Sequence, residues 1–174
     1  MRLTLWTAVA VFLIDQASKY YVVHVLRLAE VLRIDVLPPF LNLRMAWNRG
    51  VNFGLLDGTG PWLLIAVALV ISGWVIWWVR RGSHRPAAHV AAGLLLGGAL
   101  GNVVDRVIYG AVADFLNMSC CGIANPFSFN VADISIFVGA VGLVFLIDDR
   151  GKAATGSRSG GRSGGKPGGR DKTP

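Results

Sequence analysis

The sequence predicts an all-α integral membrane protein with four transmembrane helices, a small β-cradle on the outer face and both termini in the cytoplasm. The chain of 174 residues is 53% hydrophobic and only 16% charged, and its apolar residues fall in long blocks. That distribution is typical of membrane proteins and not of a soluble core. Four of the blocks approach the about 20 residues that a helix needs to cross the hydrocarbon core of a bilayer.

The four predicted spans are residues 3–26, 62–79, 87–104 and 131–147. The first span also resembles a secretory signal, because Arg2 precedes its apolar run. The run continues through Tyr20 to Leu26, however, and no small-residue cleavage site follows it. We therefore favour a retained helix.

The basic residues beside the spans predict the orientation of the chain. The side that would hold Arg2, the 80–85 turn and the C-terminal tail carries eleven Lys and Arg residues, whereas the opposite side carries five. Seven of the eleven, set against one Asp, lie from Arg150 onward, so the tail accounts for +6 of the net charge of +7. Such a tail fits an extension near anionic lipid better than a nucleic-acid-binding surface.

We expect two units, a four-helix domain over residues 1–150 and a disordered basic cytoplasmic tail over 151–174. The tail is rich in Gly, Ser, Lys and Arg and cannot bury a core. Residues 27–60 form a long outer loop in which Pro and Gly interrupt apolar and aromatic stretches, which predicts a small sheet or cradle. Residues 107–129 form a second, shorter outer loop.

The third span ends in a group of polar residues. Before them, Gly93, Gly97 and Gly101 recur every four residues, which predicts a helix face that another helix approaches closely. The polar residues then follow at spacings that place them along one side of the helix. They either end the helix at the interface or orient and neutralise a site, and they are Asn102, Asp105 and Arg106.

Two aspartates, Asp114 and Asp133, stand among apolar residues where the third span ends and the fourth begins. Because the third span exits on the side from which the fourth enters, both carboxylates are expected near the same membrane surface. Isolated carboxylates are costly to ionise near hydrocarbon, so each needs a partner or a task. When two carboxyls share a site, repulsion leaves one ionised and one protonated, which suits acid–base hydrolysis. For Asp133 alone, a favourable position at a helix N-terminus is the simpler explanation.

Other chemistry finds little support in the sequence. Asp15 and Lys19 lie four residues apart on one face of the first helix, either as a structural ion pair or as a contact for a polar group. Cys120 and Cys121 are adjacent and no Cys/His ligand spacing exists, so we expect neither a disulfide framework nor a metal site. Two other classes stay open: a small transporter or proton relay, which would place charges near helix midpoints, and a noncatalytic scaffold whose glycine-lined helices bind partners.

The residues considered above resemble the motifs of lipoprotein signal peptidase, also called signal peptidase II. Five ordered motifs carry the resemblance, which extends from the first span to the fourth and leaves only the tail unmatched. They are DQASK at 15–19, NRGVNF at 48–53, GGALGNVVDR at 97–106, GAVADF at 110–115 and FNVAD at 129–133.

The resemblance implies an aspartic endopeptidase of the bacterial inner membrane, acting near the periplasmic face without metal or cofactor. The implied substrate is a prolipoprotein whose cysteine carries a diacylglyceryl group, cleaved just before that cysteine, and the expected partners are this substrate and membrane lipid. The expected state is a monomer. Asn52 departs from the small residue usual at its position, which puts the packing of the cradle in doubt. The implied catalytic pair is Asp114 and Asp133, and the implied substrate-binding or supporting residues are Asp15, Lys19, Asn48, Gly50, Asn102, Asp105, Arg106 and Asn130.

Overall fold

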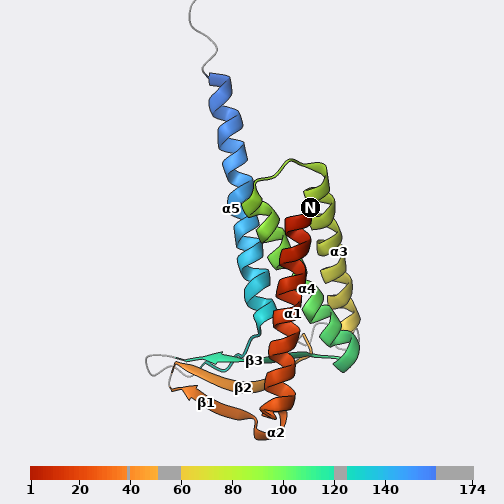
Figure 1. Cartoon of the computed structure of the whole chain (residues 1–174), viewed down its shortest axis with the longest axis vertical. Coiled ribbons are helices and arrows are strands. Elements are labelled where there is room, and N and C mark those ends of the chain that lie inside the picture. The colour runs from red at the N-terminus through yellow and green to blue at the C-terminus, as the bar shows by residue number, and fades with distance from the viewer. Residues whose placement is uncertain (39, 51–59, 120–124, 160–174) are drawn as a thin grey trace, which may run out of the picture.

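The computed structural model describes residues 1–38, 40–50, 60–119 and 125–159 of the chain. Long helices run alongside one another, and a small sheet lies across one end of the bundle (Figure 1). The N-terminus and the C-terminal part of the last helix both lie toward the end away from the sheet. The long helices are α1 (Arg2–Tyr20), α3 (Gly60–Arg81), α4 (Pro86–Tyr109) and α5 (Val131–Ser159).

Helix α4 is the centre of the bundle, since it packs against α1, α3 and α5. The predicted glycine face is confirmed, because a Cβ added at Gly93, Gly97 or Gly101 would lie 2.5 Å from an atom of α1. On another side of α4, a Cβ at Gly98 would lie 2.5 Å from the carbonyl oxygen of Ala132 in α5. The small residues therefore bring α1 and α5 against α4 at backbone distance.

The first predicted span is not one uniform α-helix. Helix α1 ends at Tyr20 and continues as a π-helical turn, η1 (Tyr21–Val25), in which the Leu26 N–H reaches the Tyr21 carbonyl at 2.9 Å. Arg27 then adopts a positive φ of 51°, and the short helix α2 (Leu28–Val31) follows. The span breaks here because the wider turn and the left-handed residue redirect the chain toward the sheet.

The described residues contain two helices, α3 and α4, that are long and apolar enough to cross a membrane by length and composition. The apolar part of α5 is shorter, Val131–Leu146. Helix α1 bears Asp15 and Lys19, and both side chains are buried. The chain is thus mostly helical with a small sheet, and the span count of four and the cytoplasmic termini stay predictions.

The sheet is antiparallel, with strand order β1 (Arg33–Leu37), β2 (Leu41–Asn48) and β3 (Val112–Met118). The cradle predicted in the 27–60 loop is therefore confirmed for β1 and β2. The third strand was not predicted, because residues 107–129 read as a loop. Strand β3 pairs with β2 so that Asp114 lies opposite Ala46, and Phe115 packs with Val22 and Leu28 beneath the sheet.

Helix α5 extends past the predicted domain boundary. It continues from the apolar part through residue 150 to Ser159, so the predicted tail of 151–174 begins inside the helix. No Pro interrupts the chain between residues 131 and 159, and a helix continues while nothing breaks its hydrogen bonding. Residues 160–174 lie outside the described part, and disorder of the tail stays a prediction.

Candidate active site

Asp114 lies in the middle of β3 and is only 2% exposed. Its Oδ2 accepts a hydrogen bond from the Asn48 side-chain amide at 3.0 Å, and its Oδ1 accepts one from the Asn130 amide at 2.6 Å. Asn48 ends the neighbouring strand β2, and Asn130 immediately precedes α5. Two donors from two elements therefore fix the plane of this carboxyl.

Asp133 lies in the first turn of α5 and is half-buried. The Asn130 side chain accepts the Asp133 N–H at 2.9 Å, and the Asp133 carboxylate accepts the Asn130 N–H at 3.3 Å. This reciprocal pair has the form of a capping box, which satisfies two N–H groups that a helix start leaves without partners. The simpler explanation of Asp133 as a helix-start residue is thus correct, and it does not exhaust the role of this side chain.

Asn130 and Asn102 connect the two aspartates. The side-chain NH₂ of the fully buried Asn130 donates to Asp114. The backbone N–H of Asn130 donates to the Asp133 carboxylate, and its side-chain oxygen accepts the Asp133 N–H. Asn102, on α4, donates to Asp133 Oδ1 at 2.8 Å and accepts a longer bond from Asn130 at 3.4 Å. The structure therefore brings the two carboxyls to one place at the sheet end of the bundle, as the predicted topology required.

The surroundings of Asp114 favour its protonated form. Burial, followed by the nearby charge of Asp133, raises the pKa of Asp114 to about 6, even though hydrogen bonds from Asn48 and Asn130 act in the opposite direction. A carboxyl in this environment can hold a proton near neutral pH. Such a pair can take a proton from water and donate another.

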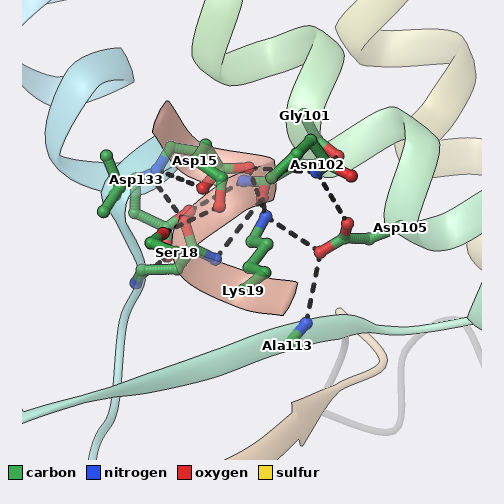
Figure 2. A network of polar contacts seen from close by, with 12 residues as sticks. Asp15, Ser18, Lys19, Gly101, Asn102, Asp105, Ala113 and Asp133 are labelled. Atoms are coloured by element: carbon green, nitrogen blue, oxygen red, sulfur yellow. Dashed lines mark hydrogen bonds and ion pairs between the residues drawn. The ribbon is translucent and has the colours of Figure 1, made fainter. Parts of the chain in front are cut away.

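A buried ion cluster lies beside Asp133 (Figure 2). The Lys19 ammonium lies 2.8 Å from Asp15 Oδ2 and 2.8 Å from Asp105 Oδ2, and it donates to Asn102 Oδ1 at 3.1 Å. None of the four residues is more than 7% exposed. Because Lys19 holds the side-chain oxygen of Asn102, the NH₂ group of the same Asn102 amide points toward Asp133.

The carboxylates of this cluster also hold backbone groups. Asp15 Oδ1 accepts the Ala132 N–H at 2.9 Å, and Asp105 Oδ2 accepts the Ala113 N–H at 3.4 Å. Each alanine immediately precedes one of the two candidate catalytic aspartates. The Lys19 cluster therefore ties α1 to the start of α5 and α4 to β3 at the positions next to the chemistry.

Asn48 and Gly50 form a turn that sets the Asn48 amide. The side-chain oxygen of Asn48 accepts the Gly50 N–H at 2.8 Å. The side-chain NH₂ of Asn48 is then directed to Asp114. Gly50 has a φ of 94°, a conformation that costs glycine little and other residues much. Asn52, the departure from the family pattern, lies outside the described residues.

Arg106 stands at the same end of α4, half-buried. Its Nη1 donates to the Asn102 carbonyl at 3.1 Å, and its buried Nε has no hydrogen-bond partner within the described residues. Arg106 and Asn102 line one end of a cavity of about 340 Å³ whose other walls are apolar residues of α3, α4 and α5. A buried donor without a partner is uncommon in folded proteins.

The structure thus places all the predicted site residues around one end of the bundle, and it adds Gln16. The Gln16 amide donates to Asp105 at 3.0 Å and to Asp15 at 3.2 Å. Its position beside Asp15 in the DQASK motif was the available signal. Within the described residues, no three His, Cys, Asp or Glu side chains are arranged to hold a metal ion.

Comparison with known proteins supports the resemblance to signal peptidase II over most of the chain. The family model described as Signal peptidase (SPase) II matches residues 7–148. The lipoprotein signal peptidase of Methylorubrum extorquens is 43% identical over 141 residues, covering 78% of this chain and 79% of the relative. That of Alteromonas mediterranea is 36% identical over 162 residues, covering 89% and 87%.

Solved structures agree. A bacterial membrane enzyme solved by the in meso method at 1.9 Å is 28% identical, with a TM-score of 0.73 over 84% of this chain and 93% of that one. A second, at 2.3 Å, is 26% identical, with a TM-score of 0.68 over 96% of each chain. The predicted resemblance is therefore confirmed, and the chain belongs to the signal peptidase II family of membrane peptidases.

Proposed function

We propose that this chain is an aspartic endopeptidase that removes signal peptides from diacylglyceryl-modified prolipoproteins, cleaving before the lipidated cysteine. The observation that carries the proposal is the pair Asp114 and Asp133, joined through Asn130 at the sheet end of the bundle. The curated relatives named lipoprotein signal peptidase support the substrate class.

The proposed mechanism uses direct attack by water and needs no metal or cofactor. Asp133, ionised, takes a proton from water, whose oxygen bonds to the scissile carbonyl carbon. Asp114, the more buried of the two, donates its proton to the carbonyl oxygen and so stabilises the tetrahedral intermediate. The C–N bond then breaks as the proton on Asp133 moves to the leaving nitrogen, and one hydroxyl proton returns to Asp114.

The proposed location is the bacterial inner membrane, with four spans, cytoplasmic termini and the sheet at the periplasmic face. The arrangement in Figure 1 supports this, because the sheet lies at one end of the helices and the N-terminus lies toward the other. A lipid-anchored substrate would diffuse within the bilayer and present its scissile bond at the level of the sheet. We propose a monomer as the working unit.

The cavity beside Arg106 supports a lipidated substrate. Its apolar walls, which include Leu64, Val67 and Ile136, suit acyl chains, and its polar end at Asn102 and Arg106 adjoins the aspartates. In the proposed complex, the Arg106 Nε donates to a substrate carbonyl oxygen. That contact would supply the acceptor that this buried nitrogen lacks within the described residues.

The test is cleavage of a synthetic precursor, with and without diacylglyceryl on its cysteine, by purified enzyme in detergent. Asp114→Asn and Asp133→Asn should each lower the rate at least about 100-fold, because each removes a proton-transfer group. Asp35→Asn is the matched control, since Asp35 lies on β1 and is exposed, and its rate should stay within about twofold. Wild-type cleavage should be unchanged in EDTA. Near-normal cleavage by either dyad variant would overturn the mechanism, and equal cleavage of the unlipidated precursor would overturn the substrate class.

A further inference from the structure

An apolar groove lies on the bundle at the end away from the sheet. Helices α1 and α3 both pack on α4 but contact each other little in the described residues, and a cavity of about 300 Å³ opens between them. Its walls are Leu5 and Ala8 from α1, Ile76 from α3, and Leu96 and Leu100 from α4. The groove is separate from the cavity beside Arg106, with which it shares no lining residue.

The groove has a cation at its mouth. Arg80, in the last turn of α3, lines the groove, is exposed and makes no ion pair among the described residues. The wall that α3 contributes runs from Ser72 to Arg80, which at the helical rise of 1.5 Å is about 12 Å of depth. The groove is thus mostly apolar, with hydroxyls from Thr4 and Ser72, and it is positively charged where Arg80 and the N-terminal Met1 line it.

The level of Arg80 is fixed by its neighbours on α3. The Arg81 guanidinium lies 4.7 Å from the centre of the Trp77 ring, and Trp74 and Trp77 are both exposed. Exposed tryptophans and arginines gather where a helix passes through the headgroup region of a bilayer. In the proposed membrane placement, Arg80 would therefore stand at the depth of lipid phosphates, and the groove below it at the depth of acyl chains.

We propose that this groove binds one acyl chain of an anionic phospholipid whose phosphate contacts Arg80. Charge complementarity selects the occupant: a zwitterionic lipid fills the apolar part equally well, but only an anionic headgroup gains fully from an unpaired cation at the mouth. The bound chain completes the packing between α1 and α3 that the protein leaves open. The inference depends on the proposed membrane placement and not on the proposed peptidase chemistry.

The experiment measures lipid retention by the purified full-length protein, using native mass spectrometry with phosphatidylglycerol and phosphatidylcholine of identical acyl chains. Wild type should retain one phosphatidylglycerol in preference to phosphatidylcholine. Arg80→Gln should weaken phosphatidylglycerol binding about fivefold, the change expected for one basic residue near anionic lipid. Arg81→Gln is the control in the same turn and should change binding less than twofold, because Arg81 does not line the groove and its guanidinium lies over the Trp77 ring.

A second pair of variants tests the groove itself. Ser72→Leu should fill it and reduce retention of both lipids, whereas Gly73→Leu adds comparable bulk at the next residue, where an added Cβ meets nothing within 4 Å. Three outcomes would each overturn the proposal: equal binding of the two lipids by wild type, phosphatidylglycerol binding that Arg80→Gln leaves unchanged, and lipid retention that Ser72→Leu leaves unchanged. Cleavage of the lipidated precursor is measured separately, so failure here is distinguishable from failure of the proposed function.

Discussion

Replacing Lys19 by Met tests the buried ion cluster. Methionine keeps the length of the side chain but leaves Asp15 and Asp105 buried without the cation that lies 2.8 Å from each. Removing one partner of a buried ion pair costs about 3–5 kcal/mol, which is a large fraction of the 5–15 kcal/mol that a domain typically has. The matched control is Arg33→Met, because the Arg33–Asp35 pair is 62% and 49% exposed and should contribute no more than about 1 kcal/mol.

The assay is the free energy of unfolding by denaturant titration in mixed micelles, together with the cleavage rate under conditions where both variants are folded. Lys19→Met should also lose activity while folded, because the Asn102 oxygen loses its donor and the amide no longer holds its NH₂ group toward Asp133. Arg33→Met should retain activity. If Lys19→Met loses no more stability than Arg33→Met, the buried ion cluster does not stabilise the fold as predicted.

Two further predictions concern Asp114 and the glycine face. The pKa of Asp114 is raised in the folded state from 3.8 to about 6, so its contribution to stability is fully present below pH 3.8 and is lost as pH rises through 6. Relative to Asp114→Asn, the wild-type free energy of unfolding should therefore fall by on the order of 3 kcal/mol between about pH 4 and pH 7. A difference in unfolding free energy that does not change with pH would contradict this. Gly101→Ala should lower the free energy of unfolding by about 1–3 kcal/mol, because the new Cβ would lie 2.5 Å from the fixed Asp15 carboxylate. The control is Gly73→Ala, where an added Cβ meets no atom within 4 Å, and its thermal unfolding should show stability equal to or greater than that of the wild type.

The sequence predicted the parts of the fold that follow from local pattern. Apolar blocks located the long helices, and the recurrence of glycine in the third span located the face that α1 approaches. Strand β3 escaped prediction because nearly all its residues are buried, so it shows no alternation of apolar and polar residues, and the period-two signal is absent. The π-helical turn at Tyr21–Val25 has no sequence signal of its own.

The site could be predicted as a set of residues but not as a network. Topology alone put Asp114 and Asp133 at one surface, whereas the contact between Asp15 and the Ala132 N–H joins residues 117 positions apart, and no local pattern encodes such a pairing. The resemblance implied that Asp15 and Lys19 either bind substrate or support the site. Their burial, at 0% and 5% exposed, favours the second of these roles.

The arrangement explains why a costly polar cluster stands inside a helical bundle. Well-packed apolar residues often stabilise a fold as much as a buried ion pair does, so stability alone does not require Lys19 between two aspartates. Asp15 and Asp105, however, accept the N–H groups immediately before Asp133 and Asp114, and one ammonium joins them. Because a misplacement of about 1 Å at reacting groups can cost 100-fold in rate, a single cation that fixes both backbones relative to each other contributes geometry that apolar packing does not specify. We infer that the cluster is retained for the spacing of the two aspartates.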